Sequence, residues 1–322
     1  MDLAPVLLIT FNRPEKTARV IQQIREAKLS ILYVSADGPR NEKERVRCME
    51  VRDLVKNSID WPCEIHYRFL EKNLGCKEAV SSAIGWFFDH EEAGMILEDD
   101  CVPSISFFRF CTEMLRLYSA NSKVYHIAGS NKQNQQKWGN GSYYFSHFPS
   151  IWGWATWKDR WEQYDINLND FDPKEMTRYN HFLHSSDQQF FYKKTWGDVK
   201  VGKVDTWDHQ WTHLVFYRRG ISIVPNTNLI TNIGFDQEAT HTTHYEKERA
   251  DQERYELEFP LRVPNEISIS EGADDVIRKY IGQVGQYQRT KQSIKQKIKE
   301  AILKLNPPKV IKNLLFKSYP NV

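Results

Sequence analysis

Three consecutive carboxylates follow a short apolar run, and of all the residues in this chain their types and spacing most clearly predict chemistry. Residues 95–97 are apolar, and Glu98, Asp99 and Asp100 come directly after them. Adjacent acids repel one another and favour a cation, and hard cations such as Mn²⁺ and Mg²⁺ prefer oxygen ligands and bridge to phosphates. The triplet therefore predicts a divalent-metal site for a phosphate-bearing ligand, with a solvated acidic turn as the alternative.

The chemistry expected of the triplet is assistance to a phosphate leaving group. When a glycosyl group leaves a nucleoside diphosphate, negative charge grows on the diphosphate, and a metal held by Asp100 would stabilise it. Residues two apart on an extended strand share a face, so we expect Glu98 and Asp100 to point together and Asp99 to point away.

Inversion at a sugar carbon also needs a carboxylate that accepts the proton of the acceptor hydroxyl from the opposite side. Asp208 is the candidate, because Trp207 and Trp211 flank it and can remove water from its surroundings. The alternative is that Asp208 only caps a helix that begins at His209.

The elements that must position these acids alternate along the first 130 residues. Apolar runs predict strands at 6–11, 31–36, 64–69 and 95–98, and helical patterns occupy 14–27, a stretch beginning near Asn41, and 77–90. Asn41 and Glu44 have the spacing of a capping box. This alternation predicts an α/β fold with a parallel sheet, whose ligands bind beyond the carboxyl ends of the strands. The polar clusters 12–14, 37–39 and 98–100 all fall at that edge.

The remainder of the chain predicts a second half of different character. Aromatic loops dominate after residue 120, so we expect a substrate-binding half at 121–245. Residues 246–285 are mixed and charged, which predicts a segment that wraps the surface. Residues 286–322 carry nine Lys and Arg against Glu300 alone, a net charge of +8. Their apolar residues follow helical spacing, which indicates a basic amphipathic helix for an anionic membrane surface or one packed on the body.

Composition narrows the class of protein. The 322 residues are 40% hydrophobic and 27% charged, which is ordinary for a globular protein, and ten Trp suit a protein that stacks on sugar faces. The five cysteines show no zinc-ligand or redox spacing, which indicates reduced thiols and a cytoplasmic location. We expect neither a signal peptide nor a membrane span, and no nucleic-acid partner.

Six motifs in order make the chain resemble the GT-A fold nucleotide-sugar glycosyltransferases. The resemblance is to the N-acetylglucosaminyltransferase I type and to bacterial enzymes of surface-polysaccharide assembly, and it spans about residues 5 to 242. The motifs are Thr10-Phe11-Asn12-Arg13-Pro14, Ser35-Ala36-Asp37-Gly38, Leu97-Glu98-Asp99-Asp100 followed by Pro103 and Phe107-Phe108, Gly153-Trp154, Trp207-Asp208, and Pro225 through Gly234 to His241.

The resemblance implies roles for the two halves of the chain and for individual residues. It implies that the half at 121–245 is acceptor-binding and catalytic, and that residues 1–120 form a nucleotide-sugar-binding half. Asp100 matches the metal ligand, and Glu98 and Asp99 match acids that contact the donor's ribose and sugar. Asp37 matches the acid that pairs with uracil, and Arg13, with Thr10 and Asn12 of the same motif, matches the nucleotide contact. Asp208 matches the region of the catalytic base, although Trp207-Asp208-His209-Gln210-Trp211 departs from the family's Trp-Asp-Asp-Trp pattern.

Other residues are weaker candidates for the same site. Related folds return a carboxyl-side His to the metal, which suggests His241, with His244 as the fallback. Lys77 lies at a strand-to-helix junction, where helix N–H groups bind phosphate or ribose. The segment Trp152-Gly153-Trp154 offers an aromatic face for a sugar, with packing of these Trp in the core as an equal alternative.

The sequence thus predicts an inverting glycosyltransferase of GT-A fold that uses Mn²⁺ or Mg²⁺. It would move a sugar from a UDP-sugar to a glycan or lipid-linked glycan in polysaccharide or lipopolysaccharide assembly, at the inner membrane face. Two alternatives remain open. One is a nucleotidyltransferase that makes a nucleotide sugar, which the lack of a Gly-rich amino-terminal phosphate loop disfavours. The other is a noncatalytic glycan-binding protein on a transferase scaffold.

Overall fold

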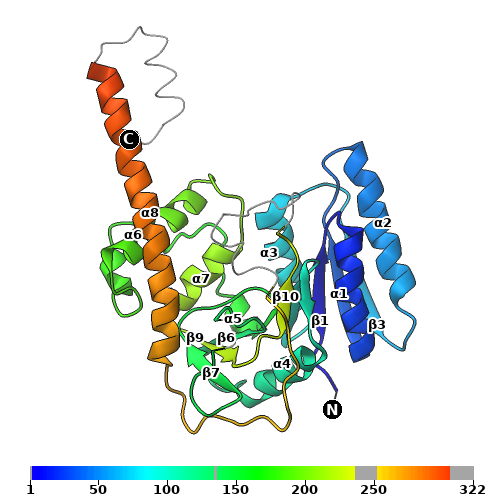
Figure 1. The fold of residues 1–322 in the computed structure, drawn as a ribbon. Helices are drawn as coiled ribbons and strands as arrows, with labels where there is room; N and C mark the ends of the chain where they lie inside the picture. Colours follow the sequence, from blue (N-terminus) through cyan, green and yellow to red (C-terminus); the bar gives the residue numbers. More distant parts are fainter. Residues whose placement is uncertain (1, 134–135, 236–251, 305–322) are drawn as a thin grey trace.

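The computed structural model describes residues 2–133, 136–235 and 252–304 of the chain (Figure 1). Its elements, in chain order, are β1 (Val6–Thr10), α1 (Pro14–Ala27), β2 (Ile31–Ala36), α2 (Glu42–Ser58), β3 (Glu64–Phe69), α3 (Gly75–Phe88), β4 (Ala93–Glu98), β5 (Cys101–Pro103), α4 (Ile105–Leu117), β6 (Val124–Ala128), β7 (Tyr143–Ser146), β8 (Trp154–Trp157), α5 (Lys158–Trp161), the 3-10 helix η1 (Met176–Tyr179), α6 (Ser186–Lys200), α7 (Asp208–Tyr217), β9 (Ile221–Pro225), β10 (Ile230–Asn232) and α8 (Glu271–Lys304).

The centre of the fold is an eight-stranded sheet with the order β3-β2-β1-β4-β8-β6-β9-β7. Strands β3, β2, β1 and β4 are parallel to one another, and β6 is parallel to β9. Strand β8 runs antiparallel to both β4 and β6, and β7 runs antiparallel to β9. A small antiparallel pair, β5 and β10, lies beyond the end of β4. The protein is therefore α/β with a mostly parallel sheet, as predicted.

Helices cover both faces of the sheet because successive strand residues point to opposite sides (Figure 1). Val6 and Leu8 of β1 pack in the same cluster as apolar residues of α1, α2 and α4. Leu7 and Ile9 pack instead with apolar residues of α3 and α7. Both faces are buried, which fixes the register of β1 and brings the carboxyl ends of β1, β2 and β4 to one edge.

The amino-terminal predictions are confirmed with small shifts. Helix α1 and strands β2 and β3 have the predicted bounds, and the Asn41 side chain caps α2 by accepting from Glu44 N. Helix α3 begins at Gly75 instead of residue 77, because a distant carboxylate, Asp205, accepts its first amides. Strand β4 begins at Ala93, because its first residues pair with β8.

The carboxyl-terminal helix differs from the prediction. Helix α8 begins at Glu271, so the expected boundary between residues 285 and 286 falls inside one helix. The early turns are helical because Ala273 and Ile281 are buried, Ile281 in the apolar cluster of η1 and α6. Beyond residue 290 the described side chains of α8 are exposed, and the helix projects from the body (Figure 1).

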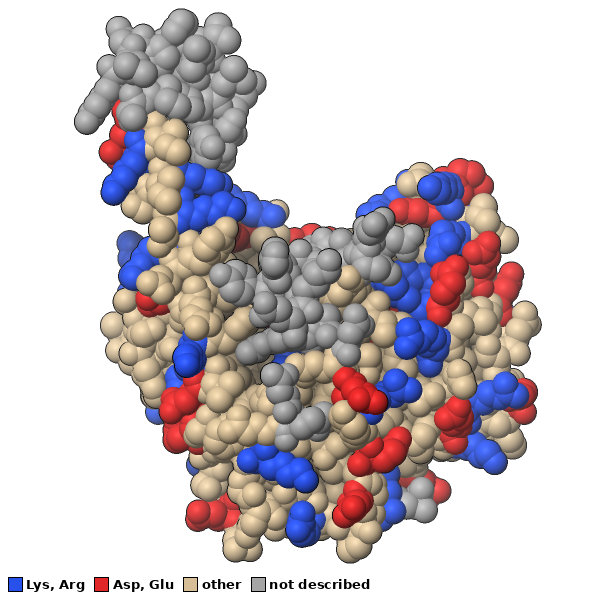
Figure 2. Space-filling model, in the orientation of Figure 1, with Lys and Arg blue, Asp and Glu red and all other residues tan. Residues whose placement is uncertain are grey.

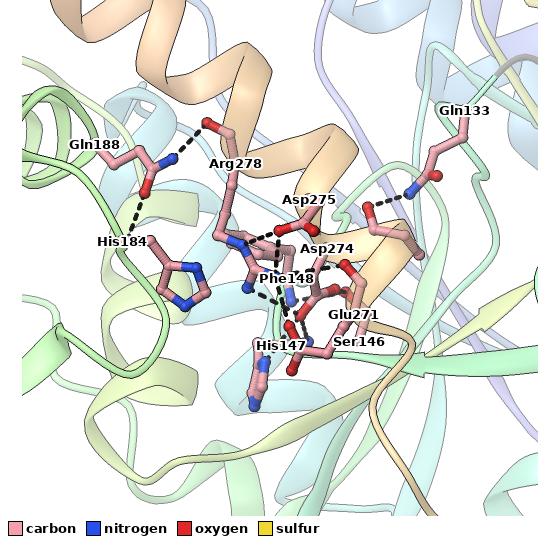
Figure 3. A network of polar contacts seen from close by, with 11 residues as sticks. Gln133, Ser146, His147, Phe148, His184, Gln188, Glu271, Asp274, Asp275 and Arg278 are labelled. Carbon is pink, nitrogen blue, oxygen red and sulfur yellow. Dashed lines mark hydrogen bonds and ion pairs between the residues drawn. The ribbon is translucent and has the colours of Figure 1, made fainter.

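A polar network fixes the first turns of α8 to the body (Figure 3). Asp274 is buried, and its carboxylate accepts from the Ser146 hydroxyl at 2.5 Å and from both the backbone N–H and Nδ1 of His147. Arg278, which is 3% exposed, donates to Asp275 and Glu271. Buried charges that are paired and hydrogen-bonded in this way specify one geometry, so they set the direction of α8.

An aromatic layer joins the sheet to α7. The Trp154 ring stacks on His126 at 5.1 Å and on Trp207 at 5.7 Å between centroids. Trp211 Nε1 donates to His126 Nδ1, which leaves the imidazole proton on Nε2, where it is donated to Ser150 O at 3.0 Å. Burial lowers the pKa of His126 from about 6.5 to about 3, so the ring is neutral at physiological pH.

The neutral His126 predicts a pH-dependent stability. The unfolded chain binds a proton below about pH 6.5 and the folded chain does not, so the free energy of unfolding falls as pH is lowered from 6.5 towards 3. Because His126→Asn removes this proton uptake, its unfolding free energy should fall by about 1.4 kcal/mol less per pH unit between about pH 6 and 4. Urea unfolding at several pH values measures this slope. The exposed His90→Asn variant is the control and should keep the wild-type slope.

Candidate functional site

The site is built at the carboxyl edge of β1 and β4, where a guanidinium meets two carboxylates. Arg13 follows β1 and precedes Pro14, the first residue of α1. Its Nη1 donates to Asp100 Oδ2 at 3.0 Å, and its Nη2 and Nε donate to the two oxygens of Asp99. The exposed fractions of the side chains are 21% for Arg13, 2% for Asp99 and 15% for Asp100. This ion pair ties the end of β1 to the end of β4.

The expected alternation of the acidic triplet is wrong. Strand β4 ends at Glu98, and Asp99 and Asp100 form a turn in which both carboxylates face Arg13. The period of two applies only while the backbone is extended. Asp99 is therefore committed to Arg13 and to the backbone N–H of Phe11, whereas Asp100 is shared between Arg13 and the solvent-accessible side of the turn.

The electrostatics of the cluster favour an additional cation. Burial raises the pKa of Glu98 to about 8, and the charges of Asp100 and Asp99 act in the same direction. Burial also raises the pKa of Asp99, although Arg13 opposes this effect. Burial works against the charge of Arg13, but Asp99 and Asp100 raise its pKa above the ordinary value. A pKa of about 8 leaves Glu98 mostly protonated at neutral pH, so the single positive charge of Arg13 is set against the two carboxylates of Asp99 and Asp100, and negative charge remains at the edge of the sheet.

The segment after β10 closes over Asp100. Ile233 N donates to Asp100 O at 2.8 Å, and a Cβ built on Gly234 would lie 2.3 Å from Asp100 Oδ2. Glycine is needed there because any side chain would collide with the carboxylate. His241 and His244, the predicted further ligands, lie outside the described residues. Within the residues that are described, no group of three or more His, Cys, Asp and Glu is arranged to hold a metal ion.

Asp208 lies at the same edge, on the first residue of α7. It is near enough to Glu98 that its charge helps to raise the pKa of Glu98. Burial would raise the pKa of Asp208 itself, but His209, the Thr206 hydroxyl and backbone N–H groups of α7 lower it overall. The lowered pKa keeps Asp208 ionised at neutral pH, and its side chain, which is 27% exposed, is accessible. Asp208 is the first residue of α7 and Trp207 occupies the N-cap position, so Asp208 is not the cap of a helix that begins at His209.

Asp37 and Thr10, at the same edge of the sheet, are more buried than Asp100. Asp37 Oδ1 accepts from Gly38 N at 2.8 Å and Leu74 N at 3.0 Å, and its Oδ2 accepts from Asn73 Nδ2 at 2.8 Å. This acid therefore orders the loop before α3. The Thr10 hydroxyl is buried and has no hydrogen-bond partner among the described residues. Asn12 O accepts from Arg47 Nε, which ties the motif of β1 to α2. The predicted nucleotide-binding roles of these residues stay predictions.

The aromatic segment 152–154 places one Trp in the core and leaves the other half-buried. Trp154 is 1% exposed and both neighbours in its stack are protein rings, so its geometry favours the packing alternative. Gly153 has a positive φ of 59°, and a Cβ there would lie 2.4 Å from Ile230 Cδ1, so glycine is required for packing. Trp152 is half-buried with Lys132 Nζ 3.5 Å from its ring centroid, and it remains the candidate for a sugar-stacking face.

Two residues of the site were missed in the sequence. Asp205 accepts from the backbone N–H groups of Cys76 and Lys77, the amides at which a phosphate was expected. Cys76 is surrounded by acids: burial raises its pKa first, followed by the charges of Glu98, Asp208 and Asp205. The only sequence signal was indirect, since α3 begins without a capping residue of its own.

Known proteins offer only distant likenesses to this chain. Neither a family model nor a curated protein sequence matches the chain. Among solved structures, UDP-glucose pyrophosphorylase in complex with UDP-glucose has a TM-score of 0.35 at 9% identity, covering 69% of this chain and 90% of that one. HddC from Yersinia pseudotuberculosis has a TM-score of 0.34 at 12% identity, covering 53% and 86%. The apo-form glycosyltransferase GlyE of Streptococcus pneumoniae TIGR4 has a TM-score of 0.27 at 8% identity, covering 91% and 64%. All three scores are below 0.5, so any functional argument must come from the site itself.

The ion pair at the centre of the site predicts a large effect on stability. Arg13→Ala leaves Asp99, which is 2% exposed, without its cation, and the free energy of unfolding should fall by about 3 kcal/mol or more. Adding Asp99→Asn should recover part of this loss, because the buried charge is removed. Urea unfolding measures both variants. Arg25→Ala is the control, since its pair with Asp60 is about half exposed and should contribute less than about 1 kcal/mol. Equal losses for Arg13→Ala and Arg25→Ala would contradict the burial argument.

Proposed function

We propose that the protein is an inverting, metal-dependent glycosyltransferase that moves a sugar from a UDP-sugar to a hydroxyl of a glycan. The observation that carries the proposal is the pairing of two acidic groups at one sheet edge. Glu98 and Asp100 lie at the end of β4 beside Arg13, and Asp208, the first residue of α7, is near enough that its charge helps to raise the pKa of Glu98. The acids at the end of β4 suit the binding of a diphosphate with its cation, and Asp208 suits the role of proton acceptor.

Asp100 is the residue proposed to hold Mn²⁺ or Mg²⁺, with His241 as the proposed second ligand. The fit rests on chemistry: the cluster keeps net negative charge, and carboxylate oxygens are hard donors that such cations prefer. The cation would neutralise charge on the leaving diphosphate. Arg13 contributes a fixed positive charge beside the same oxygens, and Asp37 and Thr10 lie on the neighbouring strand ends as proposed contacts for the nucleotide.

Asp208 is proposed to accept the proton of the acceptor hydroxyl. Its Oδ1 accepts from the Thr206 hydroxyl, and its Oδ2 lies 3.7 Å from His209 Nδ1, beyond hydrogen-bond distance, so Oδ2 is the oxygen proposed to meet the acceptor. The acceptor oxygen bonds to the anomeric carbon, the bond from that carbon to the diphosphate breaks, and the diphosphate leaves with the electron pair. A lowered pKa keeps Asp208 ionised well below neutral pH, so the base is available throughout the physiological range.

The test of the proposal is nucleotide binding that depends on metal and on Asp100. Calorimetric titration of UDP into wild type with Mn²⁺ should show binding that chelator abolishes, and Asp100→Ala should weaken it at least about 10-fold because the metal ligand is lost. Asp60→Ala changes an exposed acid far from the site in sequence and should match wild type. Equal UDP affinity with Mn²⁺ and with chelator, in wild type and Asp100→Ala, would refute the metal site. Production of a UDP-sugar from UTP and a sugar phosphate would instead identify a nucleotidyltransferase.

The role of Asp208 predicts a separation of binding from chemistry. Asp208→Asn keeps the shape of the side chain and removes its basicity, so UDP binding should persist while transfer falls by about 10²-fold or more. Transfer is measured as UDP release from UDP-sugars with and without glycan acceptors. Asp165→Asn, which changes a half-buried acid that forms local turn contacts, is the control and should keep the wild-type rate. Loss of UDP affinity together with turnover would show that Asp208 is a structural or donor-binding residue.

The exposed carboxyl-terminal part of α8 supports a lipid-linked acceptor. Tyr287, Ile294 and Ile298 are more than half exposed and lie on one side of the helix by their spacing of seven and four. Lys291, Lys295 and Lys297 accompany them, and blue side chains surround the base of the projecting helix in Figure 2. Apolar residues flanked by lysines suit an anionic membrane surface.

The orientation of α8 relative to the sheet is consistent with this acceptor. The free end of α8 and the carboxyl ends of the parallel strands point to the same side of the molecule (Figure 1). A membrane at that side would present a lipid-linked glycan to the site. No described helix is long and apolar enough to cross a membrane. The five cysteines are free, which fits the proposed location at the cytoplasmic face.

Membrane attachment through α8 predicts salt-sensitive vesicle binding. Wild type should sediment with vesicles of equal parts phosphatidylglycerol and phosphatidylcholine, and Ile294→Ser with Ile298→Ser should reduce the bound fraction several-fold by removing buried apolar area. Salt should have a similar effect, because it screens the lysines. Val201→Ser removes an exposed apolar residue outside α8 and is the control. Unchanged sedimentation of the Ile294 and Ile298 double variant would contradict attachment by this helix.

A further inference from the structure

Helix α3 is capped by a residue from the other half of the chain. The position before it, Leu74, offers no side-chain cap. Asn73 Oδ1 accepts from the first amide, Gly75 N, at 3.1 Å, and the next two amides, of Cys76 and Lys77, would otherwise lack acceptors. Asp205 supplies both: its Oδ2 accepts from Cys76 N at 3.0 Å and its Oδ1 accepts from Lys77 N at 3.0 Å. The carboxylate also meets the positive end of the helix, so charge and hydrogen bonding act together.

The backbone of α3 is shaped to admit this carboxylate. Gly75 has a φ of 78°, a conformation that L side chains rarely adopt. A Cβ built on Gly75 would lie 2.7 Å from Asp205 Oδ2, closer than real contacts allow. Any residue other than glycine would therefore both strain the backbone and displace the Asp205 carboxylate.

The same loop is held from its other side by the donor half. Asp37, at the end of β2, accepts from Leu74 N at 3.0 Å and from Asn73 Nδ2 at 2.8 Å. Residues 73–77 thus lie between two carboxylates, that of Asp37, the proposed nucleotide contact, and that of Asp205 in the segment before α7. The loop forms a direct physical link between the two halves.

Asp205 is coupled closely to Asp208. Thr206, the next residue, donates its hydroxyl to Asp208 Oδ1 and its carbonyl accepts from Gln210 Nε2 at 2.7 Å. Trp207 O accepts from Tyr164 OH at 2.9 Å. The segment from Asp205 into the first turn of α7 is therefore fixed at each successive residue. A shift of Asp205 would be transmitted to Asp208.

We propose that Asp205 is a positioning residue that clamps the segment carrying Asp208 onto the amino terminus of α3, and so sets the distance between the proton acceptor and the donor site. The catalytic part of this inference rests on the proposed function. The clamp itself rests only on the contacts of Asp205. It also means that the α3 amides hold a carboxylate of the protein, so donor phosphate is bound by other groups at the edge.

The clamp is tested first without reference to any reaction. In Asp205→Ala, hydrogen exchange followed by mass spectrometry should show faster exchange in peptides covering residues 75–78 and 203–210 together, because each segment loses its link to the other. Ser185→Ala is a matched control: it also removes a helix cap, that of α6, but away from the donor edge. It should leave both peptides as in wild type. Unchanged exchange at residues 203–210 in Asp205→Ala would overturn the clamp.

The positioning role is tested by the kinetics of UDP release from UDP-sugars. Asp205→Ala should lower kcat by about 10-fold or more with KM within about 2-fold, because misplacing a catalytic group affects the transition state more than donor binding. Asp205→Asn keeps one acceptor oxygen and should recover part of kcat. Ser185→Ala should keep the wild-type kcat. Faster exchange with an unchanged kcat would reduce Asp205 to an ordinary helix cap. Absence of UDP release in wild type would instead refute the proposed function, and the exchange experiment would still decide the clamp.

Discussion

The ion pair between Arg13 and the turn at Asp99 and Asp100 is the constraint on which the edge of the sheet depends. Two buried or half-buried acids cannot lie at the end of an apolar strand without a cation, because taking charge out of water costs several kcal/mol per ion. Arg13 meets this need from the neighbouring strand, and Pro14 begins α1 directly after it. The same contact thus fixes the end of β1, the turn after β4 and the start of α1.

The acids at this edge separate into two groups by what they already bind. Asp99, Asp37 and Asp205 have both oxygens occupied by hydrogen-bond donors of the protein, and each of them joins two segments. Glu98 and Asp208, in contrast, act on one another through charge, since the charge of Asp208 helps to raise the pKa of Glu98. Hydrogen bonds within the protein hold the first group in place, and because each carboxylate oxygen carries two lone pairs, Asp37 can still serve as the proposed nucleotide contact.

The sequence predicted the amino-terminal fold well, because that half follows local rules. Strands buried on both faces read as apolar runs, and the Asn41 cap of α2 lies three residues from its partner. The clustering of Arg13 with the triplet followed from the shared edge of parallel strands. The pairing of Asp99 with Arg13 did not follow from the sequence, because it depends on a turn that breaks the alternation.

The other misses have the same physical origin. Asp205 accepts from Cys76 N, 129 residues earlier in the chain, and no local pattern records such a contact. Trp154 was an equal candidate for a sugar face or the core, and only the stack of His126 and Trp207 around it decides for the core. The start of α8 was missed because its early turns are stabilised by buried polar groups such as Asp274 and Arg278, which read as surface residues in a sequence.

Because α8 is one continuous helix, the direction in which its exposed apolar residues face is fixed relative to the body. Its 34 residues span about 50 Å at 1.5 Å per residue, and the network around Asp274 fixes one end to the body. Each residue added between Asp274 and Ile294 would rotate the exposed apolar side by about 100° about the helix axis. Each full turn would change its reach by about 5.4 Å. The number of residues in this stretch therefore sets both which way the apolar side faces and how far it stands from the carboxyl edge of the sheet.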